Sequence, residues 1–225
     1  IMNNNKSELH GLASALIAGI LLAAAAVVSR YAYDAGSSAI SIVTTRTLII
    51  VLFLGMALKF KNVDCSIAPA ALGMVALNGV LFAIMSGGYI GAIKFIPVGL
   101  ATLIFFTFPV VVTVLLMVLR IERVTMFKLS LTLVGFVGLS IMLGTSFDTV
   151  DLRGVWLALL ASFATAINAL LIRRYFTGQN PFVTTFHISI FSLITLIIVI
   201  LVTGQPAFPN ALSGWLGLFG VGFFQ

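Results

Sequence analysis

Apolar residues run through this chain in long stretches that short polar connections separate. Each stretch is close to the roughly 20 residues that an α-helix needs to cross the hydrocarbon core of a bilayer. The pattern predicts eight membrane segments, the last of which is too short to span as it stands. They are Leu9–Ser29, Ala39–Leu58, Ala68–Ile93, Pro97–Leu119, Met126–Gly144, Gly154–Tyr175, Pro181–Thr203 and Ala211 onward. The pair Asn180–Pro181 is typical of a helix start, with asparagine as cap and proline in the first turn.

The composition gives the broad class of protein. Hydrophobic residues make up 61% of the chain and charged residues 8%, whereas a soluble domain carries about 25% charged residues. Helices satisfy their own backbone hydrogen bonds in lipid, so the sequence predicts an all-α integral membrane protein, a polytopic helical bundle. The net charge of +6 comes mainly from residues between the segments or near their ends. We therefore expect the lipid bilayer and a small-molecule solute as partners, and no nucleic acid.

The basic residues indicate the topology. Cytoplasmic connections of membrane proteins carry an excess of lysine and arginine. With the amino terminus in the cytoplasm, only Arg30, Lys94 and Arg153 lie outside. The inner basic residues are then Lys6, Lys59, Lys61, Arg120, Arg123, Lys128, Arg173 and Arg174. We expect a multi-pass protein of the plasma (bacterial inner) membrane with a cytoplasmic amino terminus.

An internal repeat is the next feature. A shift of 143 residues aligns "LHGLASALIAGILLAAAAVVSR" with "LRGVWLALLASFATAINALLIR", and a shift of 141 aligns the third segment with the eighth. Chance similarity between alanine- and leucine-rich helices is the alternative. A repeat of five segments is odd in number, so the second copy enters the membrane from the opposite side, as in many secondary transporters. We expect two inverted five-helix units, residues 1–147 and an incomplete 148–225, with ten spans in a longer protein and about eight here.

The fourth and fifth segments carry a recognisable pattern, "AIKFIPVGLATLIFFTFPVVVTVLLMVLRIERVTMFKLSLTLVGFVGLSIMLG". It resembles the EamA-type transporters of the drug/metabolite transporter superfamily. The matching features are the entry Ala92 to Pro97, the mid-helix Pro109, the pair Glu122–Arg123, and Gly135 with Gly138. The resemblance implies a secondary transporter, with export as the expected direction, that moves small organic metabolites by alternating access. It implies no cofactor, and a homodimer is left open.

Arg46 stands inside the second segment, about seven residues from its start, or roughly 10 Å at the helical rise. A guanidinium at the centre of a membrane helix costs roughly 2.5–3.5 kcal/mol on insertion scales. One interpretation is a packing and topology arginine that bonds carbonyls of a neighbouring helix. The other is a contact for an anion or carboxylate near the outer mouth. The family also tends to carry an arginine early in its second helix.

The third segment has two distinct faces. Asn78, Phe82, Met85 and Tyr89 share one face by their helical spacing, and an amide with aromatic and thioether groups suits a solute pocket. The other interpretation is ordinary packing, with Tyr89 in an interfacial aromatic belt. Small residues occupy the opposite face, where Gly87 and Gly91 form a GxxxG pair that predicts close helix packing.

Further candidates lie in the later segments. Thr165 and Asn168 share a face of the sixth segment, and an asparagine there bonds a neighbouring helix or faces a cavity. His187 lies about six residues into the seventh segment, where it is a candidate proton-linked group or a structural histidine. Pro109 predicts a kink in the fourth segment because it removes the hydrogen bond to the Phe105 carbonyl. The side chains available to satisfy the loosened backbone there are those of Thr102, Thr107 and Thr113.

The sequence argues against an enzyme. The only histidines are His10 and His187, so there is no HExxH metal motif, and "IMSGGYIG" around Ser86 lacks the frame of a serine nucleophile. We expect no metal site and no catalytic residue. All six acidic residues fall outside the segments, although proton-coupled carriers usually keep a carboxylate in the membrane. The alternative function is a non-transporting receptor or scaffold in the membrane.

Overall fold

The computed structural model describes residues 32–67, 69–121, 126–143 and 150–204. It also describes isolated positions between residues 16 and 28, and at 215, 219 and 220. Within these ranges all regular secondary structure is helical, in agreement with the predicted class. The first and eighth predicted segments, and the pair Glu122–Arg123, lie largely or wholly outside the described residues. The division into two five-helix units therefore stays a prediction.

The helices follow the predicted segments closely. Pro181–Thr203 has the predicted limits, and the others differ by a few residues or are divided. The elements are α2 (Ala39–Phe60), the 3-10 helix η1 (Pro69–Ala71), α3 (Leu72–Ile93), α4 (Val98–Phe105), α5 (Phe108–Val118), α6 (Met126–Leu143), α7 (Leu152–Tyr175) and α8 (Pro181–Thr203).

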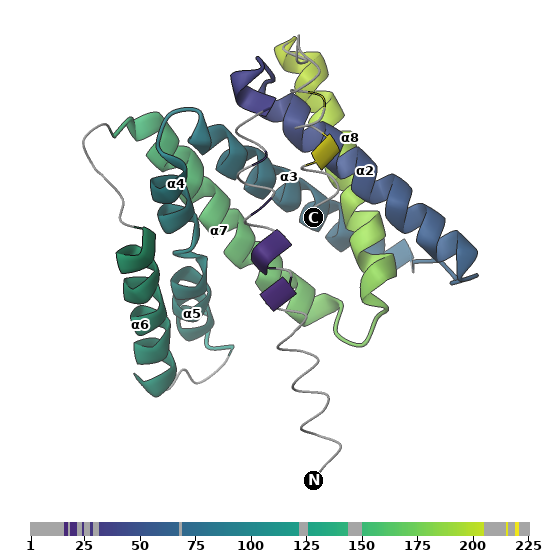
Figure 1. Ribbon diagram of the computed structural model, residues 1–225. Helices are drawn as coiled ribbons and strands as arrows, with labels where there is room; N and C mark the ends of the chain where they lie inside the picture. Colours follow the sequence, from purple (N-terminus) through teal and green to yellow (C-terminus); the bar gives the residue numbers. More distant parts are fainter. Residues whose placement is uncertain are drawn as a thin grey trace.

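The central helix of the described bundle is α3, which packs between α7 and α8 (Figure 1). On one side of it, α2 packs against α8. On the other side, α4 and α5 pack along α7, and α6 lies at the edge against α4 and α5. The order across the bundle is thus α2, α8, α3, α7, the α4–α5 pair and α6. Helices that are distant in sequence meet at the centre.

Side-chain caps explain why three helices begin where they do. Asn180 at the start of α8 accepts a hydrogen bond from the Phe182 N–H at 3.0 Å, and Pro181 follows it. The predicted Asn-Pro start is thereby confirmed. Asp151 caps α7 and Ser38 caps α2 in the same way, each satisfying a backbone N–H that has no carbonyl partner within the helix.

Large apolar side chains cover much of the outer surface. On α2, Leu52 is 59% exposed and Phe53 is 70% exposed, and Trp156 on α7 is 70% exposed. An exposed apolar surface of this extent is the surface that lipid tails cover. Within the residues that the structure describes, five stretches are long and apolar enough to span a bilayer, counting α4 and α5 as one stretch. The chain is therefore a polytopic helical membrane protein.

The connection between α2 and α3 contains the chain's single cysteine, Cys65. Next to it, the Asp64 carboxylate accepts hydrogen bonds from the Ser66 N–H and hydroxyl, each at 2.9 Å. These bonds, the backbone one first, hold the pKa of Asp64 below its usual value. The turn gives this exposed connection a defined conformation.

Candidate functional site

Arg46 is buried between α2 and α3. Its side chain is only 4% exposed, and its Nη2 donates a hydrogen bond of 2.6 Å to the Ser86 hydroxyl on α3. Its Nε has no hydrogen-bond partner among the described residues. Arg46 is seven residues from the start of α2 and Ser86 is seven residues from the end of α3, so both lie about 10 Å inside the same end of the bundle. The guanidinium therefore points into the bundle instead of toward lipid.

Two further polar side chains, both asparagines, are buried toward the other end of the bundle. Asn78 on α3 is 0% exposed and Asn168 on α7 is 5% exposed, and the Oδ1 atom of each lacks a hydrogen-bond partner. The Asn78 Nδ2 donates to the Met74 carbonyl at 2.7 Å. Each amide therefore keeps an acceptor oxygen unpaired in an apolar interior, where such an atom is costly to leave unsatisfied.

The packing of α3 against α7 relates these two asparagines. An ideal Cβ on Gly154, near the start of α7, meets the residues that follow α3, and one on Gly88 meets the Leu157 carbonyl oxygen at 2.9 Å. Moving back along α3 therefore corresponds to moving forward along α7, and the two helices are antiparallel. Asn78 and Asn168 lie at similar depth, each about 10–16 Å beyond the Gly88 contact at the helical rise.

A second close crossing lies beside Asn78. An ideal Cβ on Gly79 meets the Phe191 Cβ at 2.4 Å and the Ser192 nitrogen at 2.9 Å, so α3 and α8 touch at backbone distance there. Ser192 is fully buried and its Oγ has no hydrogen-bond partner. The crossing of α3 with α7 and α8 thus holds unpaired oxygens from each of the three helices.

The fourth segment is broken where it packs along α7. Its helix ends at Phe105 as α4 and resumes at Phe108 as α5, with Pro109 in the first turn of α5. The predicted kink is confirmed as a break. The Thr107 hydroxyl in the break donates to the Ile104 carbonyl at 2.7 Å, and it lies 2.8 Å from the Ser162 hydroxyl of α7.

Tyr89 lies on the same side of α3 as the break. Its hydroxyl is 3.0 Å from the Thr102 hydroxyl of α4, and its ring lies 4.9 Å from the Phe105 ring. These contacts turn Tyr89 toward α4, so it is not part of an aromatic belt in lipid. Phe82 and Met85, from the same predicted stripe, are half-buried within the bundle.

Thr165 and His187 are bonded within their own helices. The Thr165 hydroxyl donates to the Ala161 carbonyl at 2.7 Å, and the His187 Nδ1 lies 2.9 Å from the Val183 carbonyl.

Sequence reasoning missed three buried serines, Ser86, Ser162 and Ser192, which are partners or neighbours of the candidate residues. The available signal was a small polar residue on a buried face, and such residues are common in membrane helices.

The predicted GxxxG packing is not what the structure shows. No heavy atom of the described residues lies within 4 Å of an ideal Cβ on Gly87, and Gly91 makes only an ordinary contact with Leu157. The close approaches use Gly79 and Gly88 instead. Because α3 is packed on two sides, by α8 and by α7, its contact glycines lie on two different faces.

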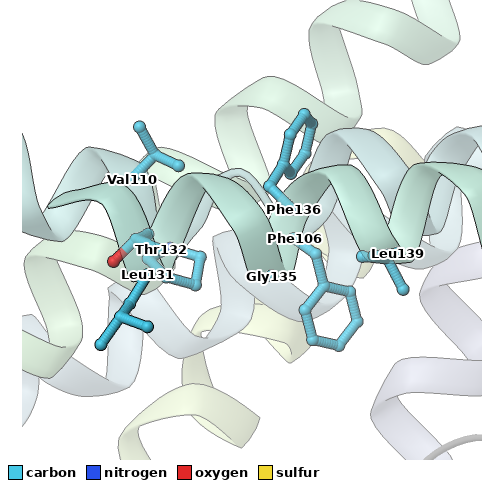
Figure 2. A pocket seen from close by; sticks show the side chains of 8 residues that line it. Phe106, Val110, Leu131, Thr132, Gly135, Phe136 and Leu139 are labelled. Atoms are coloured by element: carbon cyan, nitrogen blue, oxygen red, sulfur yellow. The ribbon is translucent and has the colours of Figure 1, made fainter. Parts of the chain in front are cut away.

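A small cavity lies between the α4–α5 break and α6 (Figure 2). Its volume is about 250 Å³, and its lining includes a single hydroxyl, that of Thr132. The lining residues are Phe106, Pro109, Val110, Leu131, Thr132, Gly135, Phe136 and Leu139. None of the predicted site residues lines this cavity, so it is separate from the buried polar side chains described above. Among the described residues there is no cluster of histidine, cysteine and acidic side chains that could hold a metal ion.

Comparisons with known proteins agree with this architecture. No curated protein matches the sequence. A solved crystal structure, described simply as that of a protein, has a TM-score of 0.65 and 17% sequence identity over 92% of this chain and 73% of its own. At that identity the likeness shows the fold alone. The model of the EamA-like transporter family matches residues 9–144, which is more than half of the chain. The chain therefore belongs to the EamA-like transporter family.

Proposed function

We propose that this protein is a secondary transporter that exports small organic metabolites across the plasma membrane by alternating access. The family match and the polytopic helical fold support transport in general. The observation that carries the proposal for this chain is the set of unpaired polar atoms in the bundle interior, on Arg46, Asn78 and Asn168. Buried polar groups are normally hydrogen-bonded, and groups without a protein partner are available to the polar atoms of a solute.

In this proposal the solute lies among α2, α3, α7 and α8. Asn78 and Asn168 offer acceptor oxygens to solute N–H or O–H groups, and Phe82, Met85 and Tyr89 form the apolar walls. Thr165 and His187 belong to the edge of the site, because each is bonded within its own helix. Two inverted five-helix units would expose this site to each side in turn.

Flux into proteoliposomes tests the proposal. We expect the protein to give saturable uptake of at least one of L-leucine, D-glucose and uridine above protein-free liposomes. Asn78→Ala with Asn168→Ala should lower that uptake about tenfold or more at equal protein incorporation, because two solute hydrogen bonds are lost. Gln179→Ala removes an exposed amide and should leave uptake unchanged. An absence of saturable uptake, or equal uptake by the double variant, would contradict the proposal.

A further inference from the structure

Arg46 is a buried cation, and no acidic side chain of the described residues is paired with it. It is the only lysine or arginine of the five candidate spans that lies away from the first or last three residues of its helix, and these spans contain no aspartate or glutamate. Within the described part of the chain, its only hydrogen bond goes to a neutral hydroxyl, that of Ser86. The described neighbours therefore leave the positive charge uncompensated.

Such an arrangement is costly for a folded bundle. Removing an ion from water costs several kcal/mol even after relaxation, and a hydrogen bond to a hydroxyl returns only a fraction of it. An arginine that served only to mark topology would extend its head group to the interface. Arg46 instead reaches α3 about 10 Å inside the bundle, with its Nε still free to donate.

A buried guanidinium with these neighbours is suited to bind an anion, and the charge count favours one class of anion. A guanidinium binds carboxylate or phosphate through parallel N–H···O bonds. A phosphate group carries up to two negative charges at neutral pH, and no second lysine or arginine lies in the interior of these five spans. A carboxylate, with a single charge, is neutralised by Arg46 alone.

Building on the transporter function proposed above, we propose that Arg46 binds the carboxylate of the transported solute. The Ser86 hydroxyl is the second polar group at this end of the site, and it can bond the solute either together with Arg46 or after its bond from Arg46 is broken. The solute class is thus small organic carboxylates, amino acids included, and the neutral amide of the same carbon skeleton is a poor ligand.

Binding to the purified protein in nanodiscs tests the assignment independently of flux. The probes are L-leucine, L-phenylalanine, L-glutamate and succinate, each with its corresponding amide, together with D-glucose, uridine and inorganic phosphate. We expect thermal stabilisation by at least one carboxylate and binding of its amide that is about tenfold weaker or more. Arg46→Gln should lose the preference for the acid over the amide, and Arg46→Lys should keep part of it because the charge remains without the planar fork.

Lys94→Gln is the matched control, because it removes the same charge from an exposed residue near the end of α3. It should bind every probe like the wild type. Equal binding of acid and amide by the wild type, or an unchanged acid preference in Arg46→Gln, would overturn the inference. Tighter binding of phosphate than of any carboxylate would overturn the choice of carboxylate.

The outcomes also separate the two proposals. If Arg46→Gln fails to fold, the wild type and Arg46→Lys still decide the question, because the ratio of the affinities for acid and amide can be measured for each. Saturable flux of glucose or uridine without binding of any carboxylate would leave the transporter standing and overturn the carboxylate site. An absence of both flux and binding would overturn both.

Discussion

At the scale of single residues, two glycines decide how closely α3 approaches its neighbours. Gly79 faces α8 and Gly88 faces α7, and at both sites an ideal Cβ falls within 3 Å of a neighbouring atom. In lipid, helices are held together by close packing and interhelical hydrogen bonds. The absence of a Cβ at these positions therefore contributes directly to the stability of the bundle.

Gly88→Ala should destabilise the protein by about 1–3 kcal/mol, because the new methyl group meets the Leu157 carbonyl and the helices must separate. Gly87→Ala is the neighbouring control, since its Cβ would enter open space among the described residues, and it should change stability by less than about 0.5 kcal/mol. Unfolding in mixed micelles measures both. Equal effects of the two substitutions would show that the close α3–α7 contact does not govern stability.

The residue scale also shows how far sequence reasoning reaches. Arg46 and Asn78 were identifiable as unusual because polar groups are expensive in membrane spans. Their neighbours, such as Ser86, were not, because a contact between α2 and α3 depends on the rotation of each helix about its axis. The prediction that Gly87 and Gly91 make the close helix contact was wrong for the same reason. A small-residue spacing indicates where close packing is possible, while the number of neighbouring helices determines which glycines are used.

At the scale of elements, the break between α4 and α5 separates two short helices within one membrane crossing. Sequence reasoning located it well, because the missing N–H of Pro109 acts locally and needs no knowledge of neighbours. The structure adds the cross-link from Thr107 in the break to Ser162 on α7. The break is therefore anchored to a neighbouring helix by a hydroxyl pair.

Pro109→Ala should close the break, because residue 109 then has an N–H that can bond the Phe105 carbonyl. We expect slower hydrogen–deuterium exchange over residues 105–110 and several-fold lower flux, since the Thr107–Ser162 contact depends on the interrupted helix. Pro97→Ala is the control, because Pro97 precedes α4 and interrupts no helix. Unchanged exchange across 105–110 would show that Pro109 does not maintain the break.

At the scale of the whole molecule, the helices are arranged so that α3 is shared by both sides of the bundle. The chain's hydropathy predicted where the described spans lie to within a few residues, since each span must be apolar over its length. It did not predict that α3, α7 and α8 form the centre, or that α6 lies at the edge. That order depends on contacts between spans far apart in sequence.

The single cysteine offers a direct test of the predicted orientation. With the amino terminus inside, Cys65 in the connection after α2 faces the cytoplasm. A membrane-impermeant maleimide should label it in inverted vesicles and leave it unlabelled in intact cells. In a Cys65→Ser background, Val150→Cys at the other end of the bundle should show the reverse. Labelling of Cys65 in intact cells would contradict the predicted orientation and place the amino terminus outside.

The bond between Arg46 and Ser86 also has a consequence for biosynthesis. Translation produces α2 before α3, so the guanidinium is made before the only hydroxyl to which it bonds. Until α3 enters beside α2, the arginine lacks that partner, and we expect its head group to extend toward the outer interface. Insertion of α3 then supplies the Ser86 hydroxyl and lets the guanidinium turn into the bundle. An early step of assembly is in this sense governed by the side chain that we assign to the solute.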